Sequence, residues 1–244
     1  MTYGMPADLT SMVLPTTGEE TRATQGLEVF GKLAAAWVVF DCARQHGETL
    51  PDGPPPMFTR YSMLPDLEFL RVHGFDGGTF APGAPPARRD SSDGAATPGA
   101  ELRRCMDRAT PVTRELQQVY APLQSQWFAR LAPLDRDPTV RKAYRSFARC
   151  LGDHHVNAKD ENDFFGLVDQ RLQASDTSGS RRLAAVYATC MKPVEAARKP
   201  LRNDLARKFR VTHAEEIAQV RAELPEKVHE MEKGYRIRFS IPKL

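Results

Sequence analysis

Apolar residues recur at steps of three and four along most of this chain, a spacing that places them on one face of a helix. The clearest case is the segment 19–46, whose apolar face consists of Leu27, Phe30, Leu33, Trp37 and Phe40. Thr16 and Thr17 precede it as capping candidates, and Gly47 follows it as a candidate C-cap. We therefore predict a long first helix that carries Cys42 in its last turn.

Prolines divide the later helical pattern. Pro111 can begin a new helix or kink a continuing one, and Pro122 predicts a bend or a restart. Pro193 and Pro200 are expected to interrupt the helix that contains Cys190.

Caps and glycines predict the ends of the remaining helices. The helix of Cys150 is expected to end at Gly152. Thr212 and Glu215 have the spacing of a capping box, so a last helix is expected to begin at about His213 and to end at Gly234.

These segments together predict an all-α fold, an irregular bundle of about six to eight helices, several of them kinked at proline. A long loop rich in glycine and proline is expected at about 76–99, because this stretch is poor in apolar residues. Residues 235–241 alternate apolar and polar positions, which indicates a short C-terminal strand, and residues 11–14 are its candidate partner. The expected parts, packed as one domain, are an irregular arm 1–18, an N-terminal half 19–132, a C-terminal half 137–234 and an extended tail 235–244.

Composition excludes some classes of function. The net charge of the 244 residues is only +3, without a Lys/Arg stripe interleaved with aromatic residues, so a nucleic-acid partner is not expected. No run of eighteen apolar residues occurs, and no transmembrane segment is expected. The longest apolar patch, 33–40, lacks the features of a signal peptide, so export would require an upstream signal. We expect a monomer with no cofactor.

The four cysteines, Cys42, Cys105, Cys150 and Cys190, suit two disulfides or four buried thiols. The two halves of the chain share a coarse layout in which an aromatic helix reaches a cysteine, a loop follows and a second helix carries Cys-Met. If each half is a helical hairpin, Cys42 pairs with Cys105 and Cys150 with Cys190, although three connectivities are open to four cysteines. In the entropic account each bridge would contribute about 3 to 4 kcal/mol.

One polar cluster carries ligand types for zinc, nickel or iron: Asp153, His154 and His155, followed by Asp160. The metal candidates are His154, His155 and Asp160. Adjacent histidines diverge on any regular backbone, however, and the spacing matches no helix-borne metal motif. The alternative is a polar loop whose Asp160 caps the next helix.

A basic stretch offers contact with an anionic surface such as lipid headgroups or a cell-wall polymer. Its candidate residues are Arg198, Lys199, Arg202, Arg207 and Lys208. Because Glu195 and Asp204 are interspersed, a solvated helix face is the alternative.

The chain contains the short motifs Phe40-Asp41-Cys42-x4-Gly47, Arg60-Tyr61-Ser62-Met63-x2-Asp66 leading to His73-Gly74-Phe75, and Tyr144-x2-Phe147-x2-Cys150-Leu151. Together these motifs resemble a family of helical proteins from high-GC, Streptomyces-like actinobacteria. Proteins of this family are typically exported or lipid-anchored. The resemblance implies no activity, substrate or catalytic residue.

Three hypotheses of function follow. The first is a non-enzymatic, disulfide-stabilised helical protein of the cell envelope that binds a small molecule or a partner protein. The second is a cytoplasmic accessory protein that binds its partner through the basic helix or the tail. The third is a metal-dependent enzyme that uses the loop of Asp153, His154 and His155.

Overall fold

The computed structural model describes residues 2–48, 57–58, 64–75, 79–80, 83–85 and 99–241. These residues form eight α-helices, one short 3-10 helix and two pairs of two-residue strands, so the all-α prediction is confirmed. The helices are α1 Leu9–Val13, α2 Gly18–Gln45, α3 Leu67–His73, α4 Ala100–Leu131, η1 Ala132–Arg136, α5 Pro138–Asp153, α6 Glu161–Gln173, α7 Thr177–Thr212 and α8 Ala214–Tyr235. The strands are β1 Thr2–Tyr3, β2 Met57–Phe58, β3 Thr79–Phe80 and β4 Ser240–Ile241. Most of the loop expected at 76–99 lies outside the described residues.

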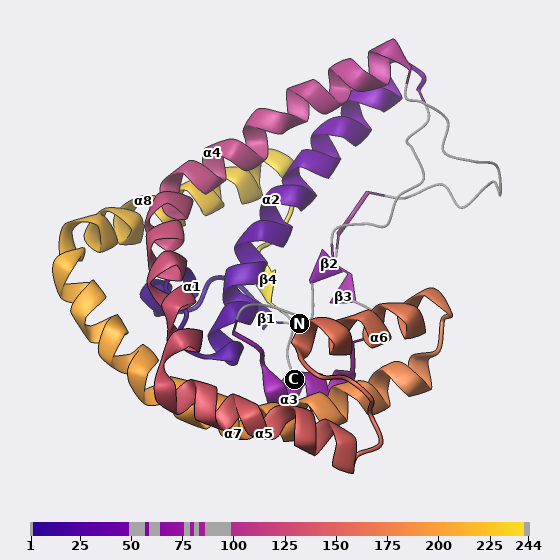
Figure 1. Ribbon diagram of the computed structural model, residues 1–244. Helices are drawn as coiled ribbons and strands as arrows, with labels where there is room; N and C mark the ends of the chain where they lie inside the picture. Colours follow the sequence, from indigo (N-terminus) through magenta and orange to yellow (C-terminus); the bar gives the residue numbers. More distant parts are fainter. Residues whose placement is uncertain are drawn as a thin grey trace.

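Two long helices, α2 and α4, run side by side in opposite directions and form an arm of the molecule (Figure 1). The start of α2 is fixed by a capping box, in which Thr17 accepts from the backbone of Glu20 and the Glu20 carboxylate accepts from the backbone of Thr17. The N-cap predicted at Thr16–Thr17 is therefore confirmed, and α2 covers nearly the same residues as the predicted first helix.

The first of two hydrophobic cores lies where α1, α2, α4, α8 and the end of α7 meet. Trp127 is fully buried there, and its indole nitrogen donates to the carbonyl oxygen of Pro15 at 2.8 Å. Phe239, from the tail, is also fully buried and packs edge-on against Phe30. The tail thus completes this core.

The second core lies among α3, α5, α6 and the first half of α7. Phe147, Phe164 and Tyr187 are each 0% exposed at its centre. Each core combines segments from both halves of the chain, because α8 joins the first core and α3 the second. The long helix α7 contributes side chains to both.

The predicted strand partner of the tail is wrong. Ser240 and Ile241 pair antiparallel with Tyr3 and Thr2, which brings the two ends of the chain together (Figure 1). Residues 11–14 belong to α1 and its C-cap. The Asp8 side chain caps α1 by accepting from the backbone nitrogen of Thr10 at 2.9 Å, which favours a helix here, and Met12 and Val13 are buried on it at 0% and 1% exposed.

The interruption predicted at Pro193 and Pro200 is also wrong, because α7 continues through both. Each proline removes one helical hydrogen bond. Both prolines face solvent, where water can satisfy the carbonyl groups that lose their donors. Packing of the neighbouring Met191 and Val194, each 0% exposed, holds the two sides of the helix in line.

Two helices that were predicted to end at a glycine end after it. Helix α5 continues past Gly152, and the residue with a left-handed backbone is His155, with φ of 59°. Helix α8 likewise continues past Gly234, and Arg236 takes the left-handed position with φ of 54°. Each turn directs the next residue, Val156 or Ile237, into a core, so burial rather than glycine sets where these helices end.

The capping box predicted at Thr212 is absent, although α8 does begin next to His213. The Thr212 hydroxyl donates to the carbonyl oxygen of Lys208 at 3.1 Å, because Thr212 is still part of α7. A hydroxyl that is bonded within the preceding helix does not cap the following one.

Candidate functional site

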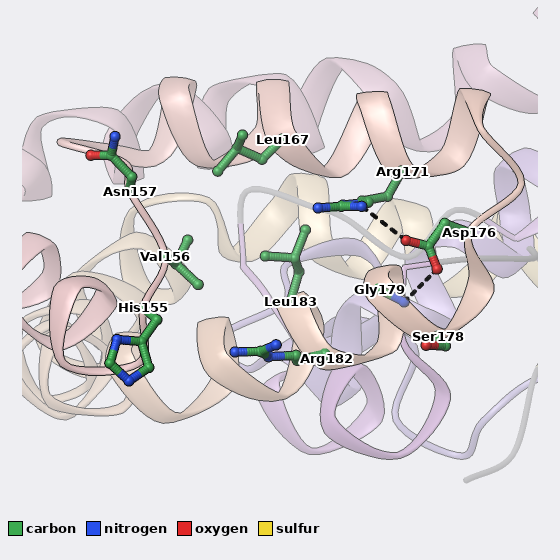
Figure 2. Close-up of a pocket in the computed structure, with 10 residues that line it drawn as sticks. All are labelled: His155, Val156, Asn157, Leu167, Arg171, Asp176, Ser178, Gly179, Arg182 and Leu183. Atoms are coloured by element: carbon green, nitrogen blue, oxygen red, sulfur yellow. Dashed lines mark hydrogen bonds and ion pairs between the residues drawn. The ribbon is translucent and has the colours of Figure 1, made fainter.

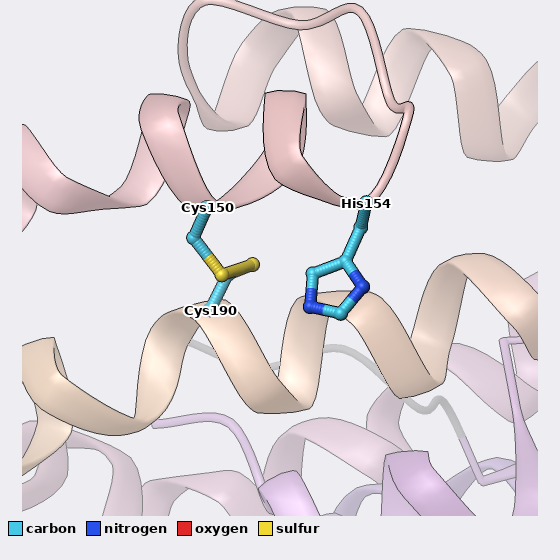
Figure 3. Close-up of side chains that lie close together, drawn as sticks. All are labelled: Cys150, His154 and Cys190. Atoms are coloured by element: carbon cyan, nitrogen blue, oxygen red, sulfur yellow. A yellow bond between two sulfur atoms is a disulfide. The ribbon is translucent and has the colours of Figure 1, made fainter.

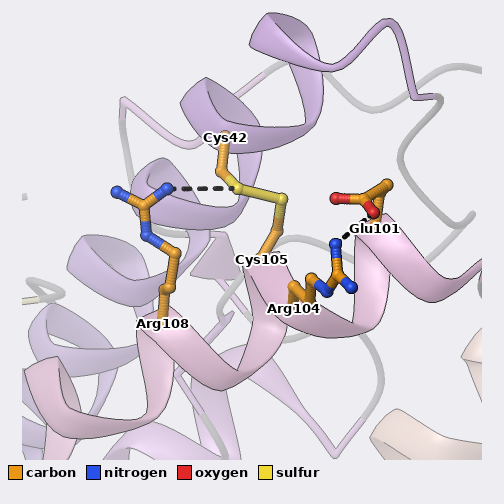
Figure 4. Close-up of a disulfide and its surroundings, with 5 residues drawn as sticks. All are labelled: Cys42, Glu101, Arg104, Cys105 and Arg108. Carbon is orange, nitrogen blue, oxygen red and sulfur yellow. Dashed lines mark hydrogen bonds and ion pairs between the residues drawn. A yellow bond between two sulfur atoms is a disulfide. The ribbon is translucent and has the colours of Figure 1, made fainter.

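The structure joins Cys42 to Cys105 and Cys150 to Cys190, with Cα atoms 5.6 Å and 5.5 Å apart. The pairing expected of two helical hairpins is confirmed, and no cysteine is free. The alternative of four buried thiols is therefore wrong. Beside the first bridge, the Arg108 guanidinium lies 3.8 Å from the sulfur of Cys42 (Figure 4).

The loop after α5 separates the two neighbouring histidines. His154 is the C-cap of α5, and its imidazole lies beside the Cys150–Cys190 bridge (Figure 3). His155, at the left-handed position, lines a hollow on another side of the loop. The backbone of His155 donates to Gly152 and that of Val156 to Leu151, which closes the helix end as a Schellman motif. The expected divergence of the two rings is thus borne out.

Asp160 has the capping role expected of it. Its carboxylate accepts from the backbone nitrogen of Asp163 at 2.9 Å and so begins α6. Within the described residues, the one group of three ligand-type atoms lying within 4.8 Å of one another comes from Cys150, His154 and Cys190. The set His154, His155 and Asp160 is not brought together in that way.

A hollow of about 570 Å³ lies between α6 and the start of α7, and we name it the α6–α7 hollow. Val156, Leu167 and Leu183 supply apolar surface, and two of them, Val156 and Leu183, are also part of the second core. The other lining residues are His155, Asn157, Arg171, Asp176, Ser178, Gly179 and Arg182. Its size falls within the range of about 300 to 1,000 Å³ typical of small-molecule sites.

The charged groups of the α6–α7 hollow are two arginines and one aspartate. Arg171 and Arg182 project from its two helical walls with Leu183 between them (Figure 2). Asp176 is already engaged, since it accepts from Arg171 at 3.1 Å and from the backbone nitrogen of Gly179 at 2.8 Å. Arg182 forms no hydrogen bond or ion pair with any residue that the structure describes. The hollow therefore offers one uncommitted positive charge next to apolar surface.

Helix α6 is held in place by a carboxylate between two phenols. Glu161 accepts from the hydroxyl of Tyr187 at 2.6 Å and from that of Tyr144. Phe164 and Phe165 on the same helix pack against the Tyr187 ring at 5.3 Å and 5.5 Å between centroids. These contacts tie α6 to α5 and α7, so the walls of the hollow are fixed before a ligand enters.

Two of the residues predicted to meet an anionic surface are buried, and this part of the prediction is wrong. Arg198 and Arg202 are 8% and 3% exposed, and both bond to Glu195, at 2.9 Å and 3.0 Å. Arg198 also bonds to Asp135 at 2.7 Å. Burial works to lower the pKa of Arg198, but the hydrogen bond to Glu195 and the two carboxylate charges outweigh it and raise the pKa. Such groups stay charged because they are paired, and they are not available to a surface.

The remaining basic candidates are exposed. Arg207 and Lys208 bond to Asp204 at 2.9 Å and 2.7 Å, as on a solvated helix face, and Lys199 faces solvent. Paired charges in water attract a further anion weakly.

A second hollow of about 700 Å³ lies between the end of α2 and the end of α8, next to the Cys42–Cys105 bridge. Trp37 and Tyr235 contribute aromatic surface to it, and Arg108 and Arg236 contribute charge. Asp41 lies in the same hollow and offsets part of that charge.

Arg171 and Arg182 were not among the residues predicted from the sequence. Their signal is local, because the turn between α6 and α7 brings the two residues to facing walls over only eleven positions, and Asp176 of this turn is the N-cap of α7.

No helix among the described residues is long and apolar enough to cross a membrane.

Comparison with known proteins gives no relative. No protein-family model matches the chain, and no curated protein and no solved structure is detectably similar to it.

Proposed function

We propose that this protein is a non-enzymatic binding protein of an oxidising compartment at the cell envelope, and that it holds a small anionic ligand in the α6–α7 hollow. The proposal rests on Arg182, which has no hydrogen bond or ion pair among the described residues and lies beside apolar surface in a cavity of about 570 Å³. A carboxylate or sulfonate with an apolar body matches this combination of charge and surface.

Two disulfides support the proposed compartment. Such bridges form and persist in oxidising environments and are rare in the cytoplasm, where thiols are kept reduced. The resemblance to exported actinobacterial proteins motivates the same placement. In the cytoplasmic alternative the four cysteines would be reduced.

The binding test uses two fluorescent probes that share an aromatic body. Anilinonaphthalene sulfonate carries a negative charge, whereas N-phenylnaphthylamine is neutral. Arg182→Ala is expected to weaken binding of the sulfonate roughly tenfold, equivalent to the loss of one charge-assisted hydrogen bond of about 1.5 kcal/mol, and to leave binding of the neutral amine unchanged.

Arg145→Ala is the matched control, because Arg145 is an exposed arginine of α5 that does not line the hollow. Equal affinities of the Arg182→Ala and Arg145→Ala variants for the sulfonate would contradict the proposed site. The compartment is tested by alkylating thiols in intact cells. Protection of all four cysteines until a reductant is added supports the envelope, and immediate labelling supports the cytoplasmic alternative.

A further inference from the structure

We propose that the Cys150–Cys190 disulfide is a redox-controlled metal site: once reduced, the two cysteines and His154 bind one Zn²⁺ ion. The two sulfur atoms and a ring nitrogen of His154 already lie within 4.8 Å of one another (Figure 3). Two thiolates and an imidazole are ligands of choice for zinc, at about 2.3 Å for sulfur and 2.0–2.1 Å for nitrogen.

Local helical geometry brings His154 to the cysteines. His154 follows Cys150 by four residues on α5, so the two side chains lie on the same face of the helix. Cys190 faces them from α7. Because the Cα atoms of the cysteines are only 5.5 Å apart, modest side-chain rotations let both sulfurs face one ion after the bond opens. Three protein ligands leave the fourth tetrahedral position to water.

The bridge is accessible from one side. Cys150 is partly exposed, whereas Cys190, Cys42 and Cys105 are 1%, 5% and 0% exposed. A dithiol reductant is therefore expected to react first at Cys150. One of its thiolates attacks the Cys150 sulfur, forms a mixed disulfide and releases the Cys190 thiolate. Its second thiolate then displaces Cys150, so that the reductant becomes a disulfide and two electrons pass to this protein. The two protons of the dithiol go to the cysteine sulfurs, or to solvent when Zn²⁺ binds.

The other bridge provides an internal control. The basic neighbour of Cys42–Cys105 is Arg108, whose guanidinium has no lone pair to offer a metal (Figure 4). Reduction of that bridge is not expected to create a metal site.

The test is a titration of the full-length protein with Co²⁺ and then Zn²⁺, after reduction by a phosphine in the absence of oxygen. Reduced protein is expected to take up one equivalent of Co²⁺, with sulfur-to-cobalt charge-transfer absorption and tetrahedral visible bands that Zn²⁺ abolishes. Oxidised protein is expected to take up none.

Four variants assign the ligands. Replacing Cys150 and Cys190 by serine is expected to abolish uptake, and replacing Cys42 and Cys105 by serine is expected to leave it intact. Because loss of a group behind a ligand already weakens metal sites about 10–100-fold, His154→Ala is expected to weaken binding at least tenfold. His155→Ala, the neighbouring imidazole that lines the α6–α7 hollow, is expected to bind as the unaltered protein does.

The proposal is overturned if reduced protein takes up no Co²⁺, if the variant without Cys150 and Cys190 still takes it up, or if His154→Ala and His155→Ala bind equally. It is also overturned if the reduced chain is unfolded and one equivalent of Zn²⁺ does not restore its helical signal, since zinc that binds a native site stabilises the fold.

Discussion

Replacing Glu195 by glutamine tests whether the buried charges on α7 are held by this one carboxylate. Glu195 bonds to Arg198 at 2.9 Å and to Arg202 at 3.0 Å, and the three side chains are 15%, 10% and 3% exposed. Glu195→Gln keeps the shape of the side chain and one acceptor but removes the charge. Arg198 retains Asp135, whereas the Arg202 guanidinium keeps no carboxylate among the described residues.

The expected loss of unfolding free energy in Glu195→Gln depends on which nitrogens of Arg202 are left without a partner. Two nitrogens of Arg202, Nε and Nη1, already lack hydrogen-bond partners, so Nη2 carries the contact with Glu195. Removing one partner of a buried ion pair costs about 3 to 5 kcal/mol. We expect about 3 kcal/mol, the lower end, because the amide oxygen of glutamine still accepts a hydrogen bond. This is a large part of the roughly 5–15 kcal/mol that stabilises a typical domain.

The assay is urea unfolding of the oxidised protein followed by far-UV circular dichroism. Arg202→Met alone is expected to cost less than Glu195→Gln, because Glu195 then keeps Arg198 as its partner. The double variant Glu195→Gln/Arg202→Met is expected to recover at least half of the loss, since the orphaned charge is gone.

Asp204→Ala is the control, because Asp204 pairs with Arg207 and Lys208 on an exposed face, and no measurable change is expected. A loss of less than about 1 kcal/mol in Glu195→Gln, the value of an exposed pair, would refute the reasoning.

Three further predictions concern stability and use the same assay. Burial raises the pKa of Tyr120 to about 12, with the Glu28 carboxylate adding to the effect. As pH rises, the phenol of the unfolded chain loses its proton before that of the folded chain. The unfolding free energy is therefore expected to be unchanged below a pH of about 10 and to fall by about 2.7 kcal/mol as the pH rises through 12. Tyr120→Phe is expected to remove this fall. Gly18→Ala would place its Cβ 2.2 Å from the Pro65 carbonyl oxygen and is expected to cost about 1–3 kcal/mol, whereas Gly152→Ala, with open space around it, is expected to gain about 0.5–1 kcal/mol. Ser175→Gly is expected to gain about 0.5–1 kcal/mol by relieving a φ of 54°, and a loss of stability would contradict the left-handed assignment.

Sequence patterns predicted the parts of the fold that depend on neighbours along the chain. The cap at Thr17 depends on a contact with Glu20 three residues away, and such contacts are visible in the sequence. The cysteine pairs are 63 and 40 residues apart, and they were predicted from the repeated layout of the two halves rather than from local contacts.

The errors concern contacts between distant segments. The pairing of the tail with β1 joins residues from the two ends of the chain, and no local pattern specifies it. Arg198 bonds to Asp135, sixty-three residues away, and the pattern of the basic stretch alone did not indicate that Arg198 is buried. At Pro193, tertiary packing of the flanking turns outweighs a local penalty.

The metal candidates named from the sequence stay a prediction. The structure places the His154 imidazole within 4.8 Å of the sulfurs of Cys150 and Cys190, and it does not bring His154, His155 and Asp160 together in that way. The hairpin layout predicted that Cys150 and Cys190 meet, and the four-residue spacing from Cys150 to His154 places the imidazole beside them.

One bond of the buried charges on α7 reaches another element and so bears on how this helix is placed. Glu195, Arg198 and Arg202 all lie on α7, so their mutual bonds move with the helix and do not set its register. Arg198 also bonds to Asp135 of η1 at 2.7 Å, and a slide of α7 by one turn, about 5.4 Å, would break this bond. The Cys150–Cys190 bridge holds α7 against α5, and the bond from Tyr187 to Glu161 holds it against α6, in this same register. The bond to Asp135, the bridge and the Tyr187 bond therefore together determine where Arg182 faces α6 across the hollow.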